Sequence, residues 1–280
     1  MSKARPNSRR NLDMAIERVS AGRGDPLRLR TALANAVVGQ MLPGGVVKGG
    51  GALKLRYGDA ATRFTRDLDT ARAIDIEAYI EELERNLEQG WNGFAGRVVP
   101  RKPAKPKNVP EGYVMQPYDI KLEYNRKPWL TVELEVGHDE IGDANDPEPM
   151  MSPDIAEVFV ELGFPAPDPV GLMPLHYQIA QKLHGLTEEG SARAHDLVDL
   201  QIILANSDVD LALTRKTCVR LFLYRNLQEW PPLVQVGEGW DTLYDRQAAD
   251  LDVLPSVEEA VAWANDLVYR IDAAEDQQRV

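Results

Sequence analysis

The sequence predicts an α+β protein, with strands and helices mixed in the first half and helices alone in the second. Two observations in the first half support this prediction: short runs rich in β-branched and aromatic residues, such as "PWLTVELEV", and segments around them with apolar residues at helical spacing. From Leu175 onward nearly every segment has helical period. The second half therefore predicts a helical domain.

The elements of the first half follow in order along the chain. "NLDMAIERVS" and "PLRLRTALANAVVGQML" predict two helices, the second with Pro26 in its first turn. "GVVKG" predicts a short buried strand that runs into the glycines from Gly49, and a short helix begins at Ala52. "TRDLDTA" predicts the next strand, and "DIEAYIEELERNLEQ" predicts an amphipathic surface helix. "GYVMQPYDIKLEYN" and "PWLTVELEV" flank the turn-like "NRKP" and predict an antiparallel hairpin.

A change of composition predicts two domains. "DANDPEPMMSPD" and "GFPAPDPVGLMP" have the Pro and Gly content of a linker, which places the boundary near Pro165. We therefore expect N-terminal helices and a mixed core in residues 1–164, and a helical domain in residues 165–280. Its helices are expected over about 175–186, 193–205, 210–227 and 257–271. Ser256 and Glu259 form a capping-box pattern at the start of the last helix.

The composition restricts the class of protein. The 280 residues are 44% hydrophobic, enough for a sizeable core, and the net charge of −12 argues against a generic nucleic-acid coating protein. Residues 1–30 and "RVVPRKPAKPK" from Arg97 are nevertheless basic, and are either polyanion contacts or solvated segments. No apolar run approaches the about 18 to 20 residues of a membrane span, and no apolar segment follows the basic N-terminus. We expect a cytoplasmic protein with no membrane partner.

Cysteine and histidine offer little chemistry. Cys218 is the single cysteine, so no internal disulfide forms, and its helical spacing from Leu213 favours a small core residue over a nucleophile. The four histidines lack zinc-binding spacing. A bound metal would therefore be held by carboxylates.

Two close aspartates supply such carboxylates. On the predicted strand, Asp67 and Asp69 present both carboxylates to one side, while Leu68 turns into the core. Oxygen ligands suit Mg²⁺, which normally shares its coordination between one or two carboxylates and the phosphates of a substrate. The alternative interpretation of the pair is a solvated strand face.

The residues before the aspartates suit a phosphate. Gly49, Gly50 and Gly51 let the backbone approach a ligand, and the helix that follows aims its first N–H groups at an anion such as a triphosphate. The nearby candidate cations are Lys54, Arg56, Arg63 and Arg66. On the predicted strand Arg63 shares the side of the two aspartates and Arg66 faces the other way, so we favour Arg63. A plain turn is the alternative interpretation of the glycines.

The two patterns together resemble a known family. "GGGAL" at Gly49 to Leu53 and "RFTRDLD" at Arg63 to Asp69 resemble the motifs G-G-[T/S]-A-L and R-x-[S/T]-x-D-L-D of nucleotidyltransferase-fold proteins. The resemblance is closest to the AbiEii-type, MenT-like toxins of type IV toxin–antitoxin systems. Gly51 departs from the family, which has a hydroxyl residue there. The resemblance implies a nucleotidyltransferase-fold mixed sheet with flanking helices.

A third carboxylate is also implied. In the family it comes from a later strand of the same sheet, and "LTVELEV" is similar to that segment. We assign Glu133 as the third metal ligand or as the base for the incoming hydroxyl, with Glu135 as its competitor and Glu123 as a poorer candidate. Two exposed acids on an edge strand are the alternative interpretation.

The helical half also resembles the family. "QIAQKLHGL" with Lys182 is similar to a helix carrying a lysine, and "RAHDLVDL" to a helix reading R-D-x-Y-D-L. The resemblance implies that Lys182 neutralises the phosphates of the nucleotide and that Asp196 holds this lysine or nearby arginines. Asp199 shares the helix face of Asp196, whereas His195 departs from the family's basic residue. A surface lysine and an ordinary helical ion pair are the alternative.

The resemblance implies a Mg²⁺-dependent nucleotidyltransferase toxin of a toxin–antitoxin or abortive-infection system. It would move a nucleoside monophosphate from an NTP to RNA, at the 3′ end of tRNA, and block translation, with a cognate antitoxin as partner. Nucleotidylation of a protein side chain and a noncatalytic binding module of the same fold are the alternatives. Thr65, counted with the nucleotide-binding residues, is a hypothetical regulatory site, because some family members are silenced by a phosphate on the Ser or Thr of this motif.

Overall fold

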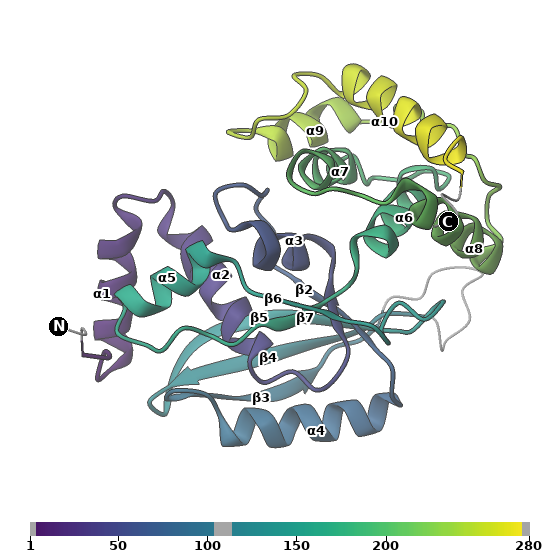
Figure 1. Ribbon diagram of the computed structural model, residues 1–280. Helices are drawn as coiled ribbons and strands as arrows, with labels where there is room; N and C mark the ends of the chain where they lie inside the picture. The colour runs from purple at the N-terminus through teal and green to yellow at the C-terminus, as the bar shows by residue number, and fades with distance from the viewer. Residues whose placement is uncertain (1–3, 104–113, 276–280) are drawn as a thin grey trace, which may run out of the picture. The chain divides into compact units, whose positions relative to one another are not determined.

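A seven-stranded mixed sheet organises the first part of the chain in this computed structural model, which describes residues 4–103 and 114–275. The strand order is β3-β4-β5-β2-β1-β7-β6 (Figure 1). The strands are β1 (Val46–Lys48), β2 (Leu68–Arg72), β3 (Phe94–Pro100), β4 (Gln116–Tyr124), β5 (Lys127–His138), β6 (Glu148–Met150) and β7 (Val170–Leu172). β2–β5 and β1–β7 pair in parallel, and the other pairs are antiparallel. The predicted α+β class is confirmed.

Five helices accompany the sheet in a first compact unit, Met1–Ala60 and Phe64–Met173. They are α1 (Arg9–Ser20), α2 (Pro26–Gly39), α3 (Gly49–Tyr57), α4 (Ile76–Gln89) and α5 (Pro153–Glu161). Ser8 and Asp25 cap α1 and α2 by accepting hydrogen bonds from backbone N–H groups of the first turn. The apolar faces of α1, α2 and α4 pack in one core with Val132 and Leu134 of β5. Only one face of β5 joins this core, and its other face carries Glu133 and Glu135.

The second compact unit is helical, as predicted, and comprises Ala61–Arg63 and Pro174–Val280. Its helices are α6 (Leu175–Leu186), α7 (His195–Asn206), α8 (Leu211–Arg225), α9 (Trp240–Ala248) and α10 (Val257–Asp272). Cys218 is fully buried in α8, and Ser256 caps α10 by accepting from the Glu259 N–H at 3.2 Å. The division into domains at residues 164 and 165 stays a prediction. Among the residues that the structure covers, no helix combines the length and apolarity needed to cross a bilayer.

The segment predicted as a linker is instead part of the first unit. It contains β6, α5 and β7, and β7 pairs with β1 through Val47 and Leu172. β6 lies at the edge of the sheet, where Pro149 is tolerated because a proline there need not donate a ladder hydrogen bond. The Pro and Gly residues that suggested a linker therefore lie in and between two short strands and a helix.

Other boundaries also differ from the predictions. β2 begins at Leu68, so neither Arg63 nor Thr65 is on a strand, and α3 begins at Gly49 instead of Ala52. β3 and α9 were not predicted. β3 is an edge strand that contains a glycine and ends at Pro100. Glycine and proline are typical of loops, so the sequence pattern did not indicate a strand here. The basic run predicted at residues 97–107 begins within β3, which contains its first four residues. Residues 104–107 of this run lie outside the described residues.

Candidate active site

The close approach of Gly49 to Asp69 shapes the start of α3. Gly49 has φ +63°, in the left-handed region that favours glycine, and a Cβ atom added there would lie 2.4 Å from Asp69 Oδ2. The preceding residue, Lys48, is the N-cap of α3 and makes no side-chain capping hydrogen bond. The first turn of α3, with its backbone N–H groups uncapped by that side chain, therefore lies against the Asp69 carboxylate.

A row of charged residues crosses three adjacent strands at this point. Lys48 on β1 is directly opposite Asp69 on β2, and Asp69 is in register with Glu135 on β5. Residues paired in this way project from the same face of a sheet. Their neighbours Leu68 and Leu134 are fully buried, whereas all three charged residues are partly exposed. The row Lys48–Asp69–Glu135 thus lies on the face opposite the core.

Asp67 lies just before β2, and its charge acts on Glu135 of the row. Its Oδ1 atom accepts a hydrogen bond of 2.5 Å from the hydroxyl of buried Thr65, which orients the carboxylate. The pKa of Glu135 is raised, first by burial and then by the negative charge of Asp67, while Arg101 and Lys48 act in the opposite direction. Glu135 is therefore linked to both aspartates: it is in register with Asp69, and the charge of Asp67 acts on it.

Glu135 and Glu133 occupy different surroundings. Both lie on the same face of β5, but Glu133 Oε2 is 2.8 Å from Arg101 Nη1 and its side chain is 52% exposed. Glu133 is opposite Asp119, and only Glu135 is in register with Asp69. Glu123 lies farther away, near the hairpin turn. The geometry thus favours Glu135 over our first choice, Glu133.

The acidic residues fit a hard divalent cation. Their side chains offer carboxylate oxygens, and the absent Cβ of Gly49 lets the Asp69 carboxylate pack against the first turn of α3. The charge of Asp67 acts on Glu135, and a cation would relieve this repulsion. Within the described residues, no three His, Cys, Asp or Glu side chains are already close enough to enclose an ion. The donor types suit Mg²⁺, which proteins usually hold through one or two carboxylates together with substrate phosphates.

Three of the residues predicted to bind phosphate, Gly50, Gly51 and Lys54, have buried side chains or positions within α3. Lys54 is 1% exposed, and its Nζ atom lies 2.5 Å from Asp59 Oδ1, so its charge is held in the interior by an ion pair. A Cβ on Gly51 would lie 3.3 Å from Leu68 Cδ1, so a larger residue there would press on the Leu68 side chain. Gly50 is buried in the same turn. Lys48, which directly precedes the glycines, is the cation that the sequence analysis overlooked.

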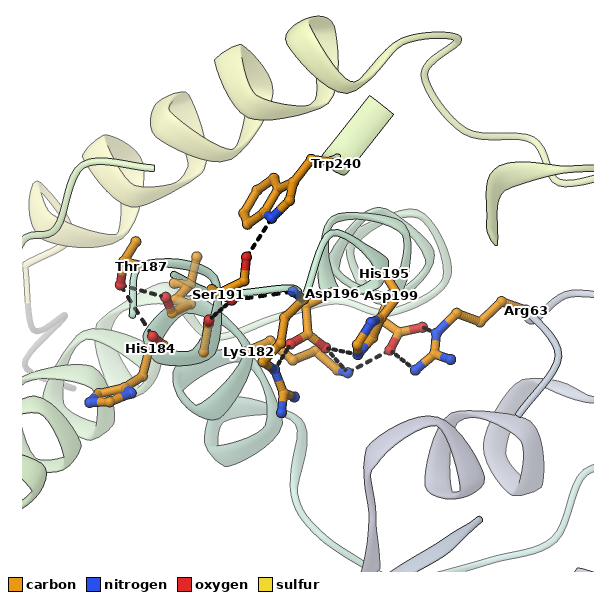
Figure 2. A network of polar contacts seen from close by, with 12 residues as sticks. Arg63, Lys182, His184, Thr187, Ser191, His195, Asp196, Asp199 and Trp240 are labelled. Atoms are coloured by element: carbon orange, nitrogen blue, oxygen red, sulfur yellow. Dashed lines mark hydrogen bonds and ion pairs between the residues drawn. The ribbon is translucent and has the colours of Figure 1, made fainter. Parts of the chain in front are cut away.

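A buried ion network in the second unit joins the other predicted residues (Figure 2). Lys182 on α6 places its Nζ atom 2.9 Å from Asp196 Oδ1 and 2.6 Å from Asp199 Oδ2, both on α7. Arg63 forms a two-point ion pair with Asp199, with Nε–Oδ1 at 2.9 Å and Nη2–Oδ2 at 3.0 Å. The prediction that Arg63 shares a strand face with the aspartates of β2 is therefore wrong. Its guanidinium is held by a buried carboxylate of the second unit.

The network keeps its two carboxylates ionised. Burial acts to raise the pKa of Asp196 and of Asp199, but Lys182 and the adjacent arginines outweigh it and lower both pKa values. Burial lowers the pKa of His195 to about 4, so this side chain is neutral at pH 7. The second cation beside Asp196 is Arg193, whose Nε atom is 2.6 Å from Asp196 Oδ2. The i, i+3 spacing of Arg193 and Asp196 was the sequence signal for this pair.

Comparisons with known proteins agree with these features. The solved structure of MenT4, a nucleotidyltransferase toxin from Mycobacterium tuberculosis H37Rv, superposes with a TM-score of 0.53 over 92% of this chain and 98% of that chain. The sequence identity is 16%, so this likeness shows the fold. A comparison with curated proteins gave no match. The family model described as nucleotidyl transferase AbiEii toxin, type IV toxin–antitoxin system, matches residues 5–267. Because that match spans most of the sequence, the chain belongs to the AbiEii nucleotidyltransferase toxin family.

Proposed function

We propose that the protein is a Mg²⁺-dependent toxin that transfers a nucleoside monophosphate from an NTP to an RNA hydroxyl, at the 3′ end of tRNA, and so blocks translation in the cytoplasm. Membership of a nucleotidyltransferase toxin family supports the transfer and implies a cognate antitoxin. The observation that carries the proposal is the close approach of Gly49 to Asp69, which brings the N-terminus of α3, where the Lys48 side chain makes no capping hydrogen bond, beside a carboxylate. A triphosphate and its cation need these two features together.

Each residue of this site has a proposed role. Asp67 and Asp69 hold the cation, which when bound would neutralise the phosphates and activate the attacking hydroxyl. The backbone N–H groups of the first turn of α3, at Gly49 to Gly51, donate to phosphate oxygens. Lys48 adds a positive charge at the same end of β1.

The proposed transfer needs a proton acceptor. The acceptor hydroxyl oxygen forms a bond to the α-phosphorus, the bond from that phosphorus to the bridging oxygen breaks, and pyrophosphate leaves. We assign the proton of the hydroxyl to Glu135. The pKa of Glu135 is raised toward neutral pH, and a carboxylate with a higher pKa is a stronger base.

Three other residues have proposed roles that the network and the motif suggest. Lys182 is the phosphate-binding cation of the second unit, and Asp196 is the residue that positions it. Thr65 is a regulatory site, because a phosphate on its hydroxyl would place negative charge beside Asp67. Mass spectrometry after coexpression with the antitoxin tests this, and a Thr65 that is always unmodified would contradict it.

One assay distinguishes the candidate functions. The purified protein is incubated with each labelled NTP, Mg²⁺, total tRNA and cell extract, and we expect label in RNA. Label in protein would indicate side-chain nucleotidylation, and label in neither would indicate a binding module. Asp69→Asn should abolish the transfer, whereas Asp146→Asn, at an exposed aspartate outside the row, should not.

A further inference from the structure

The side chain of Lys48 crosses β2 and ends over β5. A Cβ atom added to Gly137 of β5 would lie 3.2 Å from Lys48 Nζ, and β2 is the strand between β1 and β5. Gly137 is in register with Ala71 of β2. It is two residues beyond Glu135 on the same face of β5, or about 6.6 Å along the strand. The ammonium group of Lys48 therefore lies where a side chain at position 137 would begin.

The Asp69 carboxylate points the other way. Lys48 and Asp69 are directly opposite each other in the antiparallel pair of β1 and β2, a position where side chains of opposite charge attract. Asp69 Oδ2 nevertheless lies against Gly49, which directly follows β1 on the side of β2 away from β5. The two side chains thus diverge, although their backbones are paired.

The charge of Lys48 acts on carboxylates of the β5 side. Burial is the main cause that raises the pKa of Glu135 and that of Asp143, and the positive charge of Lys48 acts against the increase at both. Glu135 is on β5, and Asp143 is buried in the segment that follows β5. These effects agree with the position of the Nζ atom beside Gly137.

We propose that Gly137 is a positioning residue for the cation site. Because Gly137 has no side chain, Lys48 can extend over β5, and the Asp69 carboxylate stays open to a divalent cation instead of pairing with the lysine. The inference rests on the proposed function, because it takes Asp69 as a ligand of the cation. A Cβ at position 137 would move the ammonium group back toward Asp69, its neighbour in the register, where the lysine and the cation would compete for one carboxylate.

A double-mutant cycle in the full chain tests this inference. Mn²⁺ is the probe, because it accepts the same oxygen ligands as Mg²⁺, and its binding is measured by electron paramagnetic resonance without substrate. We expect Gly137→Ala to weaken Mn²⁺ binding about tenfold in the parent background, because an added positive charge beside Asp69 opposes the cation. In the Lys48→Ala background Gly137→Ala should have no effect, because no ammonium group remains to be displaced.

The cycle also separates the lysine from the other neighbours of position 137. The added Cβ would lie 2.8 Å from Met115 Sδ and 3.3 Å from the Thr70 carbonyl oxygen, and both contacts persist when Lys48 is absent. Gly96→Ala is the matched control, since Gly96 is a glycine of β3 whose added Cβ would meet Leu87 Cδ2 and the Lys121 carbonyl oxygen at 3.2 Å. It should bind Mn²⁺ like the parent protein, and urea denaturation checks that all variants are folded.

Four results would overturn the inference: parent-like Mn²⁺ binding by Gly137→Ala, a loss that persists in the Lys48→Ala background, an equal loss in Gly96→Ala, or no Mn²⁺ binding by the parent. Lys48→Ala alone decides the matter if Gly137→Ala does not fold. It should change Mn²⁺ affinity less than about threefold, because the ammonium group already lies away from Asp69, whereas tightening of about tenfold or more would show that the two are paired. If the parent binds Mn²⁺ but transfers no label, the proposed function fails, and the cycle still decides this inference.

Discussion

Substituting Gly49 tests whether the approach of α3 to Asp69 matters for both stability and chemistry. Alanine at this position meets two obstacles. The left-handed backbone at φ +63° costs an L-residue about 1 to 2 kcal/mol. The new Cβ would also lie 2.4 Å from Asp69 Oδ2, about 1 Å inside ordinary contact, so the carboxylate must leave its rotamer at a cost of about 0.5 to 1.5 kcal/mol.

A second glycine separates the two effects. Gly190 has φ +71° and nothing within 4 Å of a built Cβ, so Gly190→Ala carries the backbone cost alone. We expect Gly49→Ala to lower the free energy of unfolding by about 2 to 3 kcal/mol and Gly190→Ala by about 1 to 2 kcal/mol. A displacement of Asp69 by about 1 Å should lower kcat about 100-fold, because catalysis depends steeply on the position of the reacting groups.

Urea denaturation and label transfer provide the two measurements. Gly190→Ala should retain the parent kcat, which excludes a general effect of a strained residue. If Gly49→Ala loses no more stability than Gly190→Ala and keeps its activity, then the contact with Asp69 does not position the carboxylate and the proposed site is wrong.

Three further predictions concern charged residues. Burial raises the pKa of Asp143 to about 7 from 3.8, so its contribution to stability is complete below pH 3.8 and is lost as the pH rises through 7. When the pH is raised from 5 to 8, the free energy of unfolding of the parent protein should fall by about 2 kcal/mol more than that of Asp143→Asn, as measured by urea denaturation. Equal falls in the two proteins would refute the raised pKa of Asp143. Glu135→Gln should lower kcat for label transfer about 100-fold or more, while Glu133→Gln should change it less than about fivefold, and the reverse order would restore Glu133 as the third carboxylate. Lys182→Met should destabilise the protein by about 3 to 5 kcal/mol in denaturation, because two buried carboxylates lose their shared cation. Adding Asp199→Asn should recover part of the loss, and no recovery would show that the damage is not electrostatic.

Helix positions and the central strands could be predicted because their signals are local. Ser8, Asp25 and Ser256 precede apolar residues at helical spacing, and each caps the predicted helix. β6 and β7 have three residues each, too few to show a period. They are strands because β7 pairs with the edge of β1 and β6 pairs in turn with β7. That edge is set by pairings between distant parts of the chain, which no local pattern reports.

The candidate site divides in the same way. The glycines and Asp69 lie close together in the sequence, so the approach of Gly49 to Asp69 could be expected from a local pattern. The partners of Lys54 and Arg63 could not be predicted. Lys54 pairs with Asp59 and Arg63 with Asp199, and which carboxylate meets each cation depends on how the chain folds. The choice between Glu133 and Glu135 likewise depends on the register of β5 against β2, which alternation within one strand does not determine.

The late arrival of β7 has a consequence for biosynthesis. β1 receives its outer neighbour only when Val170–Leu172 has left the ribosome, long after the residues of β1 itself. Until then a nascent chain holds β1 with one unpaired edge, which is open to pairing with other chains. A recombinant fragment that stops at residue 164 would keep that edge permanently and should aggregate, whereas one that continues through Met173 should stay dispersed.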